Sequence, residues 1–208
     1  MLHGAINGGL ELRKKGRGGY SLRGAFPYGR VAVLSDGGRR GRPRKEVIAP
    51  RAFEYRVQEE TAEIHLLSGH DFAKPLASKQ AGSLVLRDSD TALTFEAEIG
   101  EELAEVSYVR DLLAAHSAGL VTGISPGFRI PPERAVPKAE TVEREPERPE
   151  EGMHGALIRT VHSALLFELS LVTRPAFPDT ESQVSARSWR LEEEERPALR
   201  VVNYARWR

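Results

Sequence analysis

Three side chains of the kinds that cooperate in acyl transfer occur in separate segments of the chain. Ser125 stands between two glycines in "GISPG", His70 follows a glycine in "LLSGHDF", and Glu168 interrupts the apolar run "LLFELSLV". A serine hydroxyl is a weak nucleophile until a base takes its proton, and an acid can orient that base. The residue types raise the hypothesis of a catalytic triad.

Ser125 and Glu168 also have ordinary structural interpretations. A serine flanked by glycines is often a bend or a close packing point, and Glu168 could lie on the solvated face of an edge strand. Strict alternation puts Leu166 and Ser170 on the face of Glu168. It puts Phe167 and Leu169 on the opposite face. Because the first face is then half apolar, we expect Glu168 not to be simply exposed, and a buried carboxylate needs a partner.

Of the six histidines, His70 has the context most suited to a general base. It stands where a strand meets a loop, and such a junction projects side chains from a rigid edge. His65 lies inside a strand and His116 near a helix C-terminus, where structural roles are more usual. Asp71 is a poor partner for His70, because neighbours on extended chain point in opposite directions. Pro131 and the proline after it exclude the long helix of an α/β-hydrolase nucleophile elbow.

The elements that must position these residues are mostly strands. Hydrophobic patterning predicts helices over 49–60 and 101–120. It predicts strands near residues 10–12, 30–34, 62–68, 82–88, 91–99 and 121–130, and one long strand or two over 156–173. Residues 1–19 are glycine-rich and basic, and we expect loose order there. The main domain should span 20–184, and 185–208 should be a C-terminal extension. Residues 131–152 hold many prolines and charges, which favours a flexible insert.

Composition narrows the classes of function. The 208 residues suffice for one domain, and 30 basic residues balance 30 acidic ones, so net charge favours neither nucleic acid nor membrane. The absence of cysteine excludes a thiol nucleophile and a thiolate zinc site, and no cofactor is implied. No apolar run is long enough for a signal peptide or for a membrane span, so we expect a cytoplasmic protein.

Four short motifs occur in an order typical of one enzyme family. "GHD", "KPLAS", "GISPGF" and "ELSLVTRPA" resemble motifs of the prohead serine proteases of tailed bacteriophages. The resemblance runs over residues 20–180, apart from the basic loop at 37–46 and the insert. It implies a fold similar to herpesvirus assemblin: a mainly β, α+β protein built as a closed antiparallel β-barrel with helices around it, commonly dimeric.

The resemblance also implies roles for individual residues. Carried over by position, Ser125 would be the nucleophile, His70 the general base and Glu168 the orienting acid. Herpesvirus relatives use a second histidine as third member, so His162 is the alternative to Glu168. Two positions depart from the family: glycine precedes His70 where asparagine is common, and Pro126 follows the serine. Because Pro126 has no N–H, the donors of an oxyanion hole must come from elsewhere.

The function implied by the resemblance is that of a serine endopeptidase in capsid maturation. Its substrates would be the scaffold segment of the phage major capsid protein and the protease itself. It would act as a homodimer in the cytoplasm of the bacterial host, inside the assembling prohead. The alternative is a non-catalytic capsid-assembly protein that keeps the same barrel, and an esterase is a more distant one.

A basic segment of the chain raises a second hypothesis, which is DNA binding. Arg40, Arg42 and Arg44 lie in "RRGRPRKE", whose R-G-R-P core resembles an AT-hook that places arginines in the minor groove of DNA. Clusters of arginine, glycine and proline also arise easily in an arginine-rich sequence. We therefore favour a connecting loop over DNA binding for this segment.

Overall fold

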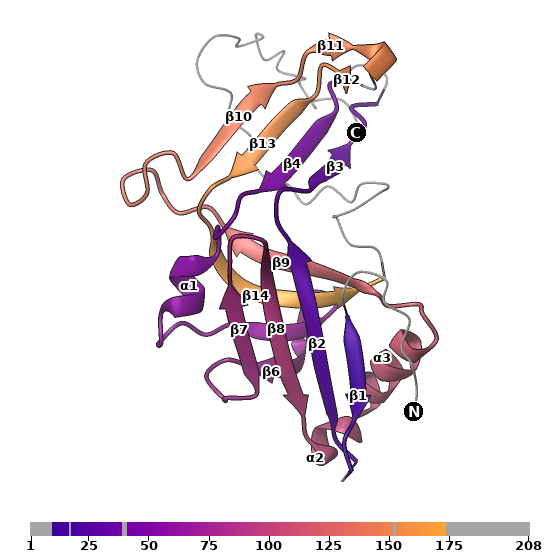
Figure 1. The fold of residues 1–208 in the computed structure, drawn as a ribbon. Coiled ribbons are helices and arrows are strands. Elements are labelled where there is room, and N and C mark those ends of the chain that lie inside the picture. The colour runs from indigo at the N-terminus through magenta and orange to yellow at the C-terminus, as the bar shows by residue number, and fades with distance from the viewer. Residues whose placement is uncertain (1–9, 17, 39–40, 152, 174–208) are drawn as a thin grey trace, which may run out of the picture.

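The computed structural model describes residues 10–16, 18–38, 41–151 and 153–173. Strands dominate, and helices are few and short (Figure 1). In chain order the elements are β1 (Glu11–Lys14), β2 (Tyr20–Pro27), β3 (Val31–Ser35), β4 (Arg44–Ile48), α1 (Glu54–Gln58), β5 (His65–Ser68), β6 (Asp71–Ser78), β7 (Leu84–Asp88), β8 (Ala92–Ile99), α2 (Glu101–Ala104), α3 (Ser107–Ser117), β9 (Gly123–Arg129), β10 (Glu140–Arg144), β11 (Glu147–Arg148), a 3₁₀ turn (Pro149–Glu151), β12 (Met153–His154), β13 (Leu157–Val161) and β14 (Leu165–Val172).

In the described part of the chain the strands form three four-stranded sheets and the two-stranded β11–β12 hairpin. The first sheet has the order β1-β2-β8-β7 and is antiparallel throughout. The second sheet has the order β6-β5-β14-β9, with β5 and β14 parallel. The third sheet has the order β10-β13-β4-β3, with β4 and β13 parallel. In Figure 1 the strands β9 and β14 cross those of the first sheet at a steep angle, and the third sheet stands at one end.

The mainly β composition was predicted, but the closed antiparallel barrel is wrong. None of the sheets that the described residues form closes into a barrel. Each sheet in the described part of the chain ends in two edge strands, and two of the strand pairs are parallel. Closure would require hydrogen bonds between those edges. Instead β3, β4, β10 and β13 pair among themselves in the third sheet.

The first and second sheets pack face to face around the core. Gly24 on β2 allows this close approach, because a Cβ there would lie 2.5 Å from the Phe95 ring and 2.6 Å from Cδ1 of Ile124. Phe95 belongs to the first sheet and Ile124 to β9 of the second. The rings of Phe53 and Phe128 meet at 5.5 Å between centroids and extend the same core. The packing fixes β9, the strand that carries Ser125.

The third sheet contains a buried ionic cluster. Arg159 on β13 is 5% exposed and lies 3.1 Å from Glu46 on β4, measured between Nη1 and Oε2. It also pairs with Glu140 on β10. Residues 131–152, predicted as a flexible insert, contain β10 and the β11–β12 hairpin's first strand. Part of this segment is thus paired with neighbouring strands, and the flexibility of the segment stays a prediction.

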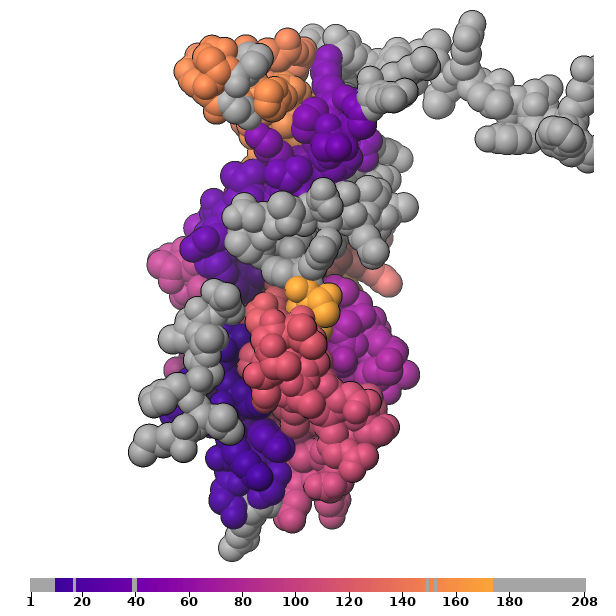
Figure 2. All heavy atoms as spheres, turned by 90° about the vertical axis from the view of Figure 1, so that its right-hand side faces the viewer, coloured from indigo at the N-terminus to yellow at the C-terminus, as the bar shows by residue number. Residues whose placement is uncertain are grey.

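Two helices replace the single one predicted over 101–120. The backbone of Val106 is extended, with ψ of 135°, and this separates α2 from α3. Figure 2 shows the pink residues of this region gathered on the lower body, with the third sheet above them. Among the residues the structure describes, every helix is too short or too polar to cross a bilayer.

Candidate active site

Ser125 and Glu168 lie on neighbouring strands of the second sheet. Ser125 is on the edge strand β9, and Glu168 is on the inner strand β14 that pairs with it. β9 and β14 are antiparallel, and their register sets Ser125 opposite Ser170 and Gly127 opposite Glu168. Directly opposite residues share a face, with Cβ atoms about 4.5–5.5 Å apart. Ser125, Ser170 and Glu168 therefore lie on one face, and Ile124 and Leu169 face the core on the other. The nucleophile candidate and the acid candidate are thus one strand apart.

A β-bulge in β14 decides which residues share that face. The register shifts between Leu166 and Glu168, so Leu166 pairs with Phe128 while Glu168 pairs with Gly127. Leu166 is fully buried in the core beside Leu169. Strict alternation was therefore wrong for Leu166, because Phe167 is the extra residue that inverts the pattern. The expectation that Glu168 is buried is confirmed, at 4% exposure.

The Phe167 ring at this bulge lies between two arginines. The guanidinium of Arg56 lies 4.7 Å from the ring centroid, and that of Arg129 lies 5.3 Å from it. Arg56 also donates to the carbonyl of Leu166 at 3.0 Å. Cation–π contacts of this kind are favourable. Together they tie α1 to the strand that carries Glu168.

His70 occupies the tip of the hairpin that joins β5 to β6. Ser68 pairs with Asp71, so Gly69 and His70 form a two-residue loop. Both have left-handed backbone, with φ of 64° and 63°. A type I′ turn requires positive φ at both of its central residues. The Gly69 N–H donates to the carbonyl of Leu171 at 3.1 Å, which fastens the loop to β14.

The turn brings His70 to Glu168. Nδ1 of His70 lies 2.8 Å from Oε1 of Glu168. The His70 side chain is 47% exposed, whereas that of Glu168 is 6% exposed. An ionised carboxylate only accepts hydrogen bonds, so Nδ1 is the nitrogen that donates in this contact, and a neutral imidazole then carries its lone pair on Nε2. The pair therefore joins a buried acid to an open imidazole in the tautomer that a general base needs.

Gly127 makes room for this contact. A Cβ at residue 127 would lie 1.8 Å from Oε1 and 2.5 Å from Cδ of Glu168. The Glu168 side chain thus lies directly across the β9 backbone on its way to His70. The second glycine of "GISPG" is required because any side chain at residue 127 would clash with Glu168. The sequence showed the glycine but gave no sign of this reason.

Other candidate residues have different surroundings. His162 follows β13, and its Nε2 lies 3.0 Å from Oγ1 of Thr141 on β10, so the structure joins Glu168 rather than His162 to His70. Asp71 accepts from the N–H of Ala73 at 2.9 Å. That bond and the Lys74 ammonium hold the pKa of Asp71 below its ordinary value.

Pro126 fits the edge position of its strand. β9 is an outer strand of the second sheet, and proline is tolerated at a sheet edge because the N–H that it lacks is not needed to pair with a further strand.

The three arginines of the AT-hook-like segment lie at or before β4. Arg42 is exposed before β4 and Arg44 is the first residue of β4, while Arg40 lies outside the described residues.

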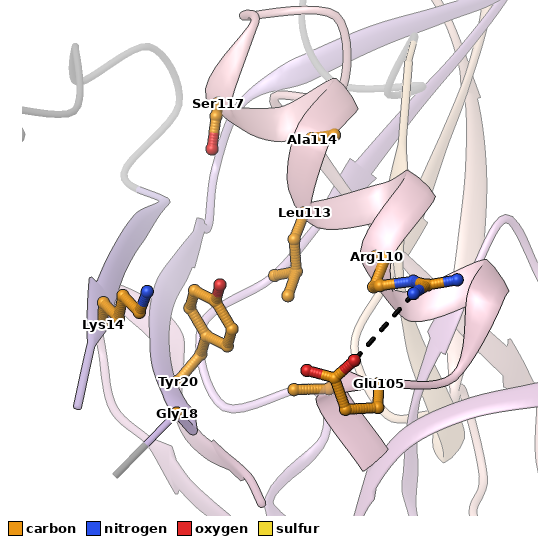
Figure 3. A pocket seen from close by; sticks show the side chains of 9 residues that line it. Lys14, Gly18, Tyr20, Glu105, Arg110, Leu113, Ala114 and Ser117 are labelled. Carbon is orange, nitrogen blue, oxygen red and sulfur yellow. Dashed lines mark ion pairs between the residues drawn. The ribbon is translucent and has the colours of Figure 1, made fainter. Parts of the chain in front are cut away.

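A pocket lies apart from these residues in the fold. It has a volume of about 320 Å³ and is lined by residues of β1, β2, α2 and α3 (Figure 3). Figure 3 shows the ring of Tyr20 facing Leu113 across it, and the ion pair of Glu105 with Arg110 at its rim, 3.9 Å between charged atoms. Its lining includes neither Ser125, His70 nor Glu168.

Comparison with known families shows which family the chain belongs to. A family model described as caudovirus prohead serine protease matches residues 31–195. The chain belongs to this family. The matched range contains Ser125, His70 and Glu168, so all three lie in the part of the chain that the prohead proteases share. Comparison with curated proteins and with solved structures found no match.

Family membership and the turn geometry together explain Gly69. Prohead proteases commonly have asparagine before the histidine, and asparagine and glycine are the residues that best tolerate left-handed backbone. Gly69→Asn is therefore expected to stay within about 1 kcal/mol of the wild type in free energy of unfolding, whereas Gly69→Val should lose about 1–3 kcal/mol. Urea unfolding measures both.

Gly16→Val is the matched control, because residue 16 has open space around it and no positive φ. Equal stabilities for Gly69→Val and Gly69→Asn would contradict the assigned turn.

Proposed function

We propose that this chain is a serine endopeptidase that cleaves the scaffold segment of the phage major capsid protein, and itself, during prohead maturation. Ser125 is the nucleophile, His70 the general base and Glu168 the acid that orients it. The observation that carries the proposal is the 2.8 Å contact between His70 and the buried Glu168, on the sheet face that also holds Ser125. Membership of the prohead protease family supports the substrate.

The residues have complementary tasks in acyl transfer. Nε2 of His70 takes the Ser125 proton as Oγ attacks the scissile carbonyl, and the imidazolium then protonates the leaving amine. The Glu168 carboxylate stabilises the imidazolium and holds its tautomer. Water next attacks the acyl-enzyme, with His70 again as base. Pro126 cannot donate to the oxyanion, so the donors are other groups of the site.

The position of β9 suits a chain-like substrate. An outer strand leaves backbone groups on one side free of sheet pairing, and extended peptides commonly bind such edges. Exposed loops of the protease are then reachable by a second copy, which fits self-cleavage. We place the reaction in the assembling prohead within the host cytoplasm, with the protease as a homodimer.

Intact-mass analysis over time tests the proposal. Wild type, Ser125→Ala and the control Ser117→Ala are each expressed alone and with the capsid protein. Defined truncations should appear in the wild type and in Ser117→Ala, which changes an exposed serine at the end of α3. They should vanish in Ser125→Ala. Uncut masses in all samples, with folded protease and capsid protein present, would support the non-catalytic assembly protein instead.

A further inference from the structure

We propose that Ser170 is a positioning residue that holds the acid and the base of the triad in one fixed arrangement. The inference rests on the proposed function. Ser170 is fully buried on β14, one of the two inner strands of the second sheet. Its Oγ lies 2.7 Å from Oε2 of Glu168 and 2.9 Å from the backbone nitrogen of His70. One hydroxyl therefore contacts both partners of the His70–Glu168 pair.

The direction of both hydrogen bonds follows from chemistry. A backbone N–H can only donate, so Oγ of Ser170 accepts from His70. An ionised carboxylate can only accept, so the Ser170 hydroxyl proton points to Glu168. Each oxygen of the Glu168 carboxylate then has one donor: His70 Nδ1–H on Oε1 and Ser170 O–H on Oε2. Two donors on opposite oxygens fix the rotation of the carboxylate plane.

The second bond steadies an unusual backbone. A residue with a side chain rarely adopts positive φ, and such a conformation persists only when its surroundings hold it. The loop of Gly69 and His70 is held to β14 by two adjacent N–H groups, one on the Leu171 carbonyl and one on the Ser170 hydroxyl. The second contact depends on a side chain, so it can be removed by substitution.

Ser170 acts only through its neighbours. It lies opposite Ser125 in the β9–β14 register, but its single proton is used on Glu168. It therefore neither attacks the substrate nor relays the Ser125 proton. Its effect is on the geometry of the imidazole that receives that proton, and a misplacement of about 1 Å at such a group costs about 10²-fold in rate.

The test uses the full chain and a fluorophosphonate probe. The probe forms a bond between Ser125 Oγ and phosphorus, fluoride leaves, and His70 takes the serine proton, so the labelling rate reports activation of the nucleophile without the capsid substrate. Ser170→Ala should lower the limiting labelling rate by about 10–100-fold, with the half-saturating probe concentration unchanged. Ser170→Thr, which keeps Oγ, should label within about threefold of the wild type.

Ser21→Ala is the matched control, because Ser21 is also a buried serine on a strand. Thermal unfolding of each variant separates positioning from stability. Wild-type labelling that Ser125→Ala abolishes, combined with full-rate labelling of Ser170→Ala, would overturn the role of Ser170 while the proposed function stands. Equally slow Ala and Thr variants, both folded, would overturn it too. If wild type takes no label, the proposed function itself fails.

Should Ser170→Ala not fold, Ser170→Cys carries the test, since a thiol has similar size and forms weaker hydrogen bonds. Slow labelling of a folded Ser170→Cys supports the inference, and wild-type labelling contradicts it.

Discussion

Glu168→Gln is expected to slow acyl transfer by about 10³–10⁴-fold while the protein stays folded. The side chain keeps its size, so the cause lies in charge and hydrogen-bond direction. Glutamine offers one acceptor and one NH₂ group where the carboxylate offered two acceptors. One of the two partners, Ser170 or His70, must then face a donor.

The hydrogen bonds of Ser170 determine that His70 is the partner that loses its acceptor. Ser170 already accepts from the His70 N–H and directs its own proton to Oε2 of residue 168. The glutamine oxygen therefore takes the Oε2 position, and the NH₂ group faces Nδ1 of His70. That nitrogen must then accept, which moves the ring proton to Nε2. An imidazole in this tautomer cannot take the Ser125 proton.

The rate of fluorophosphonate labelling at Ser125 measures this loss. Glu63→Gln is the matched control, because Glu63 is a partly buried glutamate that, like Glu168, accepts from a serine hydroxyl, here that of Ser78 at 2.9 Å. It should label at nearly the wild-type rate. A folded Glu168→Gln that labels as fast as Glu63→Gln would remove Glu168 from the triad and return His162 to consideration.

Gly127→Ala is expected to reduce the same rate by about 10²-fold or more. The added Cβ would lie 1.8 Å from Oε1 of Glu168, 2.5 Å from Cδ and 2.8 Å from Cγ. Separations below 3 Å to three atoms of one side chain cannot persist, so the carboxylate must leave its place. Because His70 contacts the same Oε1 at 2.8 Å, the move breaks the acid–base pair.

Gly100→Ala is the control for Gly127→Ala. Residue 100 precedes α2 with φ of −65°, and a Cβ there enters open space. Intact mass after timed labelling gives the rates, and urea unfolding gives the stabilities. The expected pattern is a large loss of rate for Gly127→Ala alone. Unimpaired labelling of Gly127→Ala would mean that the Glu168 side chain takes another path to His70.

Several elements could be predicted because their patterns are local. β8 alternates Leu93, Phe95, Ala97 and Ile99 toward the core, and the prediction of a strand over 91–99 matches Ala92–Ile99 closely. β4 was missed because its five residues include three charged ones. Glu46 among them is buried through its pairing with Arg159, which is 113 residues distant. No local pattern announces such a partner.

The candidate site also contains residues that could be predicted from the sequence and contacts that could not. The resemblance of the four motifs to one family pointed to Ser125, His70 and Glu168, and contacts between residues far apart in the chain supplied the rest. Ser170 was visible two residues after Glu168, on the same face, but its bond to the His70 backbone depends on how β5 pairs with β14. The closed barrel, which was expected from the family resemblance, was wrong. Closure depends on how the edges of sheets meet, and neither short motifs nor alternation within a strand report that.

The distance along the chain between His70 and Glu168 also determines when their contact can form during synthesis. Glu168 lies 98 residues after His70, on a strand that inserts between β5 and β9. A ribosome adds about 5–20 residues per second, so roughly 5–20 s separate the synthesis of the two residues. In the later part of that time the nascent chain holds both His70 and Ser125, but the carboxylate that contacts the imidazole is still missing. The arrival of β14 completes the second sheet and the pair of His70 and Glu168 in one step. With the roles that we propose for these residues, the nascent chain gains activity only when that sheet is assembled.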